Sequence, residues 1–164
     1  MHILFLSAWY PYPPDNGSKI RVHHLLRGLS ARHEVDLVTF LPPDGTVPHG
    51  DLVAEGLCAR AHLVRRAPFE ADPWQKRRGL FSRTPSHLKA YRSIEMEQLA
   101  ASLAAARNLD VVIASTGLVA PIAIRLPARA RILEEHNYLG RMLGEQYERA
   151  TDPLRRCRSW LTWR

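Results

Sequence analysis

The sequence predicts an α/β fold in which a parallel sheet carries helices on both faces. Short apolar segments alternate along the 164-residue chain with longer segments whose apolar residues recur every three or four positions. The first short segment is apolar at every position from Ile3 to Leu6, as expected for a strand buried on both faces. Strands that alternate with helices in this way are typical of a parallel sheet.

Five segments are predicted to be strands because each is short, rich in apolar or β-branched residues and bounded by turn residues. Pro42 and the three residues that follow it, Pro-Asp-Gly, are expected to end the second strand. The predicted strands are residues 3–8, 34–40, 61–64, 110–114 and 130–133.

Helices are predicted between these strands. In the first, which begins at Ser18 and ends near Ala31, the apolar residues fall at i, i+3, i+4 and i+7 on one stripe. Residues 65–85 show no clear periodicity and carry six basic residues, so a long loop is expected there. The other predicted helices are residues 51–60, 94–106, 117–126 and 138–149.

The chain is strongly basic, with a formal net charge of +7 and an isoelectric point near 10.0. Such a balance favours anionic partners: nucleic acid, an acidic lipid surface or a phosphate-bearing substrate. No nucleic-acid-binding motif accompanies the charge, so a nucleic acid is not expected as a partner. Residues 65–83 combine basic clusters with Trp74 and Phe81. Two interpretations of this segment stay open: it contacts an anionic membrane, or it is a solvated arginine-rich loop.

A cytoplasmic location is expected, and a peripheral position on the inner face of the membrane stays open beside it. No apolar run approaches the roughly 18 residues that a membrane helix needs, and the first strand is too short for a signal-peptide core. Cys58 and Cys157 are isolated in sequence and expected to be buried or inert. The histidines show no metal-binding spacing, so neither a metal nor a cofactor is expected.

The loop after the first strand is the first candidate site. Asn16, Gly17 and Ser18 open the predicted helix directly after the loop. Glycine permits close approach of a ligand to the backbone, and the free amides of a helix start attract anions, so a phosphate or a sugar oxygen fits here. A plain turn capped by Asn16 or Asp15 is the alternative, and it stays open. The loop lacks the GxGxxG and GK[ST] patterns of dinucleotide and P-loop sites.

Residues 1–40 (MHILFLSAWYPYPPDNGSKIRVHHLLRGLSARHEVDLVTF) resemble the amino-terminal segment of group 1 glycosyltransferases, a large retaining family with the two-domain GT-B fold. The matching features are the first strand, the PPDNGSKIR loop, the following helix and the second strand. DVVIAS at 110–115 and ARILEEHN at 130–137 fall where that family has its fourth and fifth strands. The resemblance implies a Rossmann-like acceptor-side domain over residues 1–150, one half of a GT-B fold.

The resemblance also implies a function. The parent protein would be a hexosyltransferase that moves a sugar from a nucleotide-sugar donor to a saccharide or lipid-linked acceptor with retention, in polysaccharide or glycolipid assembly. Residues 151–164 are expected to form a basic amphipathic helix that begins at Asp152-Pro153, a truncated connection to a missing donor-binding domain. Without that domain the fragment is not expected to be active. The alternative is a non-catalytic Rossmann-like module that binds an anionic ligand.

Two groups of site residues follow from the resemblance. Asn16, Gly17 and Ser18 would line the cleft, and Lys19 and Arg21 would add positive charge near a phosphate.

The second group follows the fourth and fifth strands, where ligands bind in parallel sheets. In the segment Glu134-Glu135-His136-Asn137, His136 is the candidate catalytic residue, because its charge is tunable near neutral pH and it can donate to a sugar hydroxyl or a phosphate. A surface or capping role for His136, with solvated glutamates beside it, stays open. The other predicted substrate-binding residues are Ser115, Thr116, Glu135 and Asn137.

Overall fold

The computed structural model describes residues 1–42, 51–66, 91–135 and 139–163. The chain divides into two compact units, one formed by Met1–Pro68 with Tyr91–Glu134 and the other by Phe69–Ala90 with Glu135–Arg164. The described part of the first unit holds a parallel sheet and its covering helices, and that of the second holds a pair of helices.

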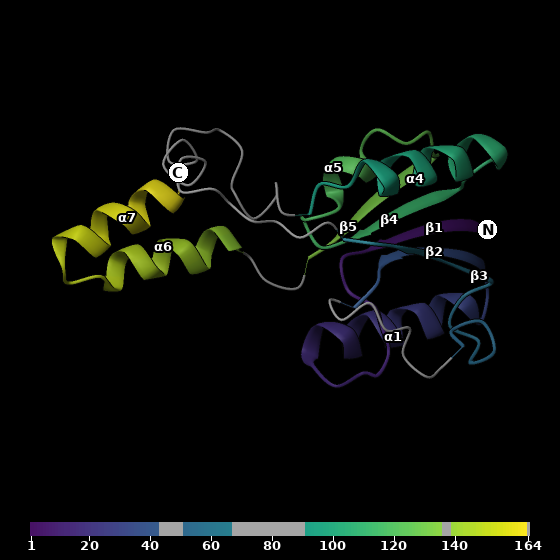
Figure 1. The fold of residues 1–164 in the computed structure, drawn as a ribbon, viewed down its shortest axis with the longest axis horizontal. Helices are drawn as coiled ribbons and strands as arrows, with labels where there is room; N and C mark the ends of the chain where they lie inside the picture. Colours follow the sequence, from purple (N-terminus) through teal and green to yellow (C-terminus); the bar gives the residue numbers. More distant parts are fainter. Residues whose placement is uncertain (43–50, 67–90, 136–138, 164) are drawn as a thin grey trace. The chain divides into compact units, whose positions relative to one another are not determined.

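The first unit is built on a five-stranded, all-parallel sheet with the strand order β3-β2-β1-β4-β5 (Figure 1). From β1 the chain adds β2 and β3 on one side and then returns to add β4 and β5 on the other. The order therefore reverses between β1 and β4, which is the topological switch point of the sheet. The strands are β1 (His2–Ser7), β2 (Glu34–Phe40), β3 (Arg60–Val64), β4 (Val111–Ser115) and β5 (Ala130–Glu134).

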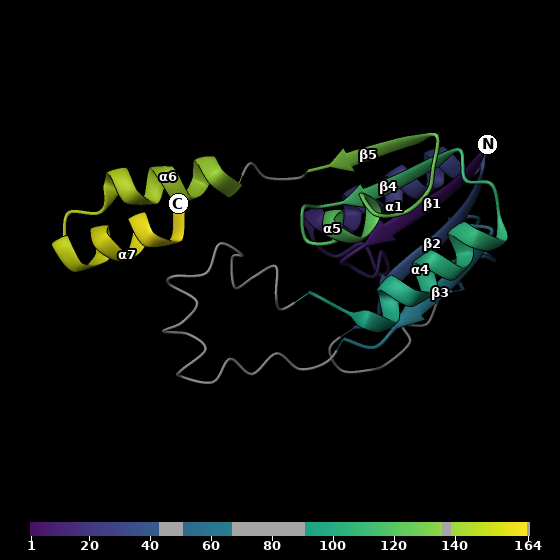
Figure 2. The same cartoon turned by 90° about the horizontal axis from the view of Figure 1, so that it is seen from above.

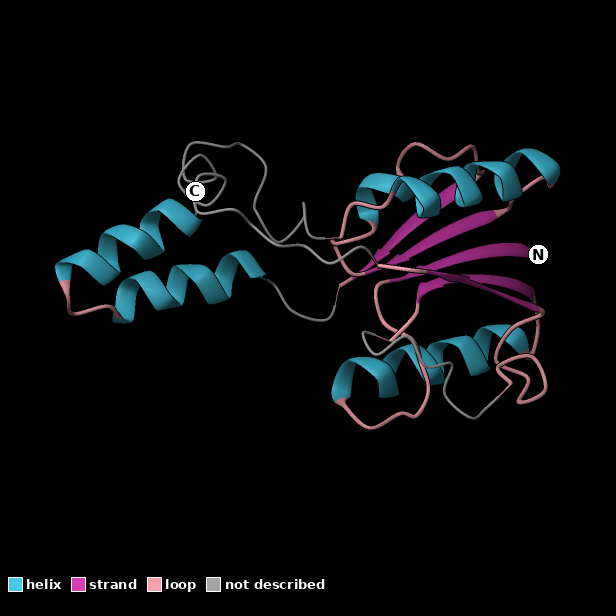
Figure 3. Ribbon diagram, in the orientation of Figure 1, coloured by secondary structure: helices cyan, strands magenta, loops and turns pink. Residues whose placement is uncertain are grey.

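The predicted fold class is confirmed, since helices cover both faces of this sheet in a Rossmann-like arrangement. Helix α1 (Gly17–Ser30) lies on one face, and α4 (Ile94–Ala106) and α5 (Ala120–Ala123) lie on the other (Figures 2 and 3). The side chain of Asn16 caps α1 by accepting the Lys19 N–H at 3.1 Å. Ser93 caps α4 in the same way, accepting the Met96 N–H at 3.2 Å. These caps satisfy amides that have no partner inside the helix, so both helices begin close to the predicted residues.

The prediction of a short helix at residues 51–60 is wrong, because this segment consists of turns. One helical hydrogen bond forms, from the Glu55 N–H to the Asp51 carbonyl at 2.9 Å. Gly56 then adopts a left-handed φ of +70°, which ends the turn and directs buried Leu57 and Cys58 into the core.

The predicted helix at residues 117–126 is shorter in the structure, where only Ala120–Ala123 is helical. Pro121 has no N–H to donate. On either side the N–H groups bond three residues back, from Val119 to Thr116 at 3.3 Å and from Leu126 to Ala123 at 3.2 Å. This 3₁₀-type bonding replaces the longer α-helix.

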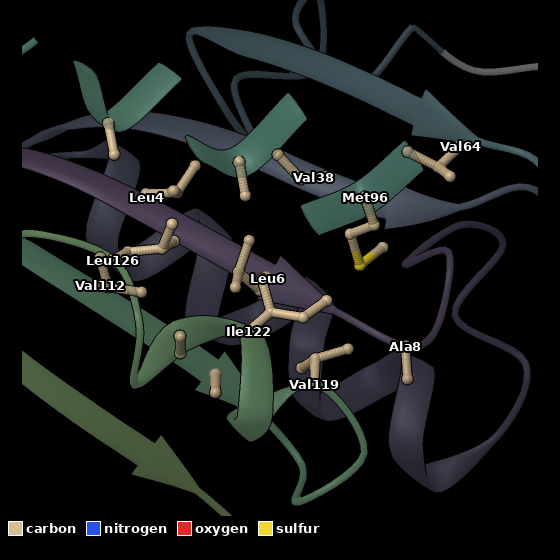
Figure 4. Close-up of a cluster of buried hydrophobic side chains, with 14 of the residues drawn as sticks. Leu4, Leu6, Ala8, Val38, Val64, Met96, Val112, Val119, Ile122 and Leu126 are labelled. Carbon is tan, nitrogen blue, oxygen red and sulfur yellow. The ribbon is translucent and has the colours of Figure 1, made fainter. Parts of the chain in front are cut away.

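The core has one layer on each face of the sheet, and β1 contributes to both. Leu4 and Leu6 pack toward α4 and α5, together with Met96 and Ile122 (Figure 4). Ile3 and Phe5 pack toward α1 in the other layer. Each of these four β1 side chains is at most 2% exposed. Burying a large apolar side chain contributes about 1.5–3 kcal/mol, which accounts for the apolar run Ile3–Leu6 in a strand covered on both faces.

Ion pairs close the amino edge of the sheet around Glu34, the first residue of β2. Its carboxylate accepts hydrogen bonds from the side chains of His2, Arg60 and Arg107, the last at 2.9 Å. Arg60 also donates through Nε to the buried Asp36 at 2.6 Å. Hydrogen bonds from Arg60, His2 and Arg107 lower the pKa of Glu34 from 4.5 to about 2. This network joins the amino ends of three strands to the residue that follows α4.

We predict that Glu34 makes the stability of the sheet unit sensitive to acid. Because its pKa is depressed in the folded state, its contribution is fully present above about pH 4.5 and is lost as the pH falls toward about 2. Urea unfolding at several pH values should show a steeper loss of stability between these limits for the wild type than for Glu34→Gln. The control is Glu55→Gln, which removes an exposed glutamate. A wild-type profile parallel to that of Glu34→Gln would contradict this role.

The second unit contains two antiparallel helices that pack against each other, α6 (Leu139–Arg149) and α7 (Pro153–Trp163) (Figure 1). Asp152 accepts the Leu154 N–H at 3.1 Å, and Pro153 occupies the first helical position, as the sequence predicts.

The predicted boundary between residues 1–150 and 151–164 stays a prediction. None of the helices in the described ranges combines the length and apolarity needed to cross a bilayer.

The two cysteines are free and lie in different environments. Cys58 is buried in the α1-side core, and burial raises the pKa of its thiol to about 11, with the charges of Asp36 and Asp51 adding to the shift. Cys157 is exposed on α7. Since the thiolate is the reactive form, only Cys157 is chemically accessible in the folded protein.

We therefore predict that one thiol equivalent reacts rapidly with Ellman's reagent at pH 8 and that the second reacts only after unfolding. Cys157→Ser should abolish the rapid phase without affecting the second. Rapid reaction of both thiols in the native wild type would show that Cys58 is not protected.

Candidate functional site

A row of polar side chains crosses the carboxyl edge of the sheet on the face covered by α1. Ser7 at the end of β1 pairs in register with Thr39 of β2 and with Ser115 of β4, and Ser115 pairs with Glu134 of β5. Residues paired across parallel strands point to the same face, here the face on which Ile3 and Phe5 pack toward α1. We call these four residues the carboxyl-edge row. It spans the switch point, where ligands bind in open α/β sheets.

Glu134 connects the carboxyl-edge row to α1. One of its carboxylate oxygens accepts a hydrogen bond from Ser115 Oγ at 3.1 Å, and the other accepts one from Arg21 Nε. The Glu134 side chain is 13% exposed, whereas that of Arg21 is 53% exposed. The three residues, which we call the Arg21 cluster, come from β5, β4 and the second turn of α1. They place an exposed guanidinium beside the switch point.

The chain takes an unusual conformation directly after β4. Thr116 has a φ of 85°, in the left-handed region that β-branched residues rarely adopt. Its N–H donates to the Glu134 carbonyl at 2.7 Å, which extends the pairing of β4 with β5, and Leu118 N–H donates to its hydroxyl at 3.4 Å. A left-handed conformation costs roughly 1–2 kcal/mol for an L-residue, and such strain clusters at functional sites.

The start of α1 is open to solvent. Gly17 is exposed, a Cβ built on it would meet no atom within 4 Å, and its φ lies outside the left-handed region. Neither packing nor backbone conformation within the described residues therefore requires glycine at this position. Close approach of a ligand to the backbone would explain a glycine at position 17.

The neighbouring cation, Lys19, is already paired. Its ammonium group lies 3.0 Å from a carboxylate oxygen of Asp15. This hydrogen bond lowers the pKa of Asp15 below its ordinary value. Lys19 and Asp15 thus partly cancel each other's charge beside the helix start.

The structure brings some of the predicted site residues together. Asn16, Gly17, Ser18 and Lys19 form the start of α1, and Arg21 is joined through Glu134 to Ser115 and, along the backbone, to Thr116. Glu135 is exposed and belongs to the second unit. The predicted catalytic residue His136 and the predicted ligand Asn137 lie outside the described residues, so their roles stay predictions.

Glu134 begins the candidate segment 134–137, but the sequence assigned it no substrate-binding role. Its place in the sequence was the available signal. Glu134 directly follows the predicted strand 130–133, so it is expected at the edge where the parallel strands end. Its partner Arg21 lies 113 residues earlier in the chain, and nothing local in the sequence links the two.

Within the described ranges, no three His, Cys, Asp or Glu side chains gather as metal ligands would. Comparisons of the chain with family models, with curated proteins and with solved structures give no match.

We predict that Thr116→Gly is more stable than Thr116→Ala by about 1 kcal/mol. Both variants remove the hydroxyl and methyl groups, and only alanine retains the penalty of a left-handed φ. Urea denaturation of the two variants measures the difference directly. Equal stabilities, or a more stable alanine variant, would show that Thr116 is not strained.

Proposed function

We propose that this chain is the acceptor-side domain of a retaining glycosyltransferase that transfers a sugar from a nucleotide-sugar donor to a saccharide or lipid-linked acceptor. Two lines of support meet at one place. Residues 1–40 resemble the amino-terminal segment of group 1 glycosyltransferases, and the loop that carries the resemblance opens α1 at the carboxyl edge of a parallel sheet. The observation that carries the proposal is the exposed start of α1 at Gly17, with the Arg21 cluster one turn further along.

The chemistry of this site suits a phosphorylated substrate. In retaining transfer of this kind the donor's diphosphate leaves with a growing negative charge. Amide hydrogens at the start of a helix of 14 residues, together with the helix dipole, attract such a charge. The outer N–H groups of the Arg21 guanidinium, which is paired with Glu134 through Nε, can bind two phosphate oxygens.

These groups are positioned before the substrate binds, which is what electrostatic stabilisation requires. Asn16 fixes the first turn of α1, and Glu134 and Ser115 fix Arg21. His136 is proposed to donate a hydrogen bond to a sugar hydroxyl or a phosphate. The net charge of +7 favours the approach of an anionic substrate.

The test is transfer of sugar by the full product of the reading frame that encodes this chain. With radiolabelled nucleotide sugars and a polyprenyl diphosphate-linked or saccharide acceptor, the wild type should form a glycosylated product. Gly17→Val should lower the rate at least about tenfold, equivalent to about 1.4 kcal/mol, because the added side chain occupies the space that the substrate approaches.

The matched control is Gly28→Val on the same helix. Gly28 is likewise exposed, and a Cβ built there also meets no atom within 4 Å. This variant should transfer sugar at the wild-type rate. Equal activity of Gly17→Val and wild type would contradict the placement of the substrate. Binding of an anionic ligand without any transfer would favour the non-catalytic binding module instead.

A further inference from the structure

We propose that Glu134 is a positioning residue that, together with Ser115, holds the Arg21 guanidinium in the orientation in which it binds the diphosphate group of a substrate. Glu134 acts at the site described above, so its role rests on the proposed function. The ligand class is a diphosphate ester, recognised through its negative charge and its paired oxygens.

The first support is the way in which Arg21 is held. Glu134 engages Nε, the nitrogen nearest the chain, by an ion pair. No partner of the two terminal nitrogens is found among the described residues, and the side chain is 53% exposed. A guanidinium is a planar fork whose outer N–H groups match two phosphate oxygens. An ion pair at Nε therefore orients the fork and leaves its outer edge accessible to a ligand.

The second support is the anchoring of Glu134 itself. Its second carboxylate oxygen accepts the hydroxyl hydrogen of Ser115 at 3.1 Å, and Ser115 is fully buried. Its main-chain carbonyl accepts the Thr116 N–H at 2.7 Å. Glu134 is thus held to β4 and to the residue that follows it through both its side chain and its main chain, and this restricts the movement of Arg21. An ordered side chain loses less conformational entropy when a ligand binds, which raises affinity.

The third support is the location of Arg21 on α1. Gly17 and Ser18 precede Arg21 by four and three residues, so all three lie on one side of the helix. The backbone amides of Gly17 and Ser18 and the Arg21 guanidinium can therefore bind the same ligand. A diphosphate has two phosphoryl groups, and this region offers a separate positive element to each of them.

A purely structural ion pair between α1 and β5 is the competing interpretation, and it predicts the opposite sign. If Glu134 only ties the two elements together, its negative charge repels a nearby anion, and neutralising it should strengthen anion binding. If Glu134 positions Arg21, neutralising it should weaken binding in spite of the favourable change in charge.

The experiment is isothermal titration of the 164-residue chain with inorganic pyrophosphate at low ionic strength, because salt screens exposed charges. We expect Arg21→Ala to lower affinity about tenfold or more, Glu134→Gln about fivefold and Ser115→Ala about twofold. Glu55→Gln removes an equal charge from an exposed glutamate outside the Arg21 cluster and sets the nonspecific effect. Unchanged or tighter binding by Glu134→Gln would overturn the proposal.

A charge-preserving variant guards against a folding defect in Glu134→Gln. Glu134→Asp retains the negative charge and withdraws the carboxylate by one methylene, so it should also weaken pyrophosphate binding. Circular dichroism and thermal unfolding establish that each variant is folded. Wild-type affinity in a folded Glu134→Asp protein would contradict a positioning role.

Two further ligands distinguish the source of the diphosphate. Uridine diphosphate represents the donor, and farnesyl diphosphate represents a lipid-linked acceptor. The ligand that binds at Arg21 should be the one whose affinity falls about fivefold in Glu134→Gln. If neither falls, the proposal fails.

The positioning role and the proposed function can fail separately. Weaker pyrophosphate binding by Glu134→Gln without sugar transfer by the encoded enzyme would uphold the positioning role alone. Transfer by the encoded enzyme with unaltered pyrophosphate affinity in Glu134→Gln would uphold the transferase alone.

Discussion

Parallel pairing of β1 with both β2 and β4 is the constraint on which the rest of this structure depends. The middle of a central strand with helices on both faces does not meet water, so it is apolar, as residues 3–6 are. Its neighbours run in the same direction, and each crossover must therefore return the chain to the amino edge before the next strand begins. All carboxyl ends consequently meet at one edge, and this gathers polar residues from distant parts of the sequence.

The two edges of the sheet use charged residues differently. At the amino edge, Glu34 is surrounded by His2, Arg60 and Arg107, and the network satisfies its carboxylate from three sides. Such an arrangement ties strands together and presents little to a ligand. At the carboxyl edge, Glu134 is held by buried Ser115 and in turn holds an arginine whose outer end is exposed. Glutamate–arginine pairs thus stabilise the fold at the amino edge and are suited to ligand binding at the carboxyl edge.

Several features of the carboxyl edge are consistent with a binding role. The start of α1 is capped yet open, Gly17 is not required by the local packing, and Thr116 holds a strained conformation beside the Arg21 cluster. Strain of this kind persists only where the surrounding structure compensates for it, here through the hydrogen bond from Thr116 to β5. An excess of positive charge over the whole chain adds long-range attraction for anions.

The sequence by itself determined the strands and the two long helices of the sheet unit, because burial and capping leave local periodic patterns. It predicted a helix at residues 51–60, where the structure has turns, and a longer helix at residues 117–126, of which only Ala120–Ala123 is helical. It selected the start of α1, Arg21, Ser115 and Thr116 as separate candidates. Only the tertiary structure decided that Glu134 joins Arg21 to Ser115, since the order and register of the strands arise from the packing of the crossovers and leave no trace in any local segment.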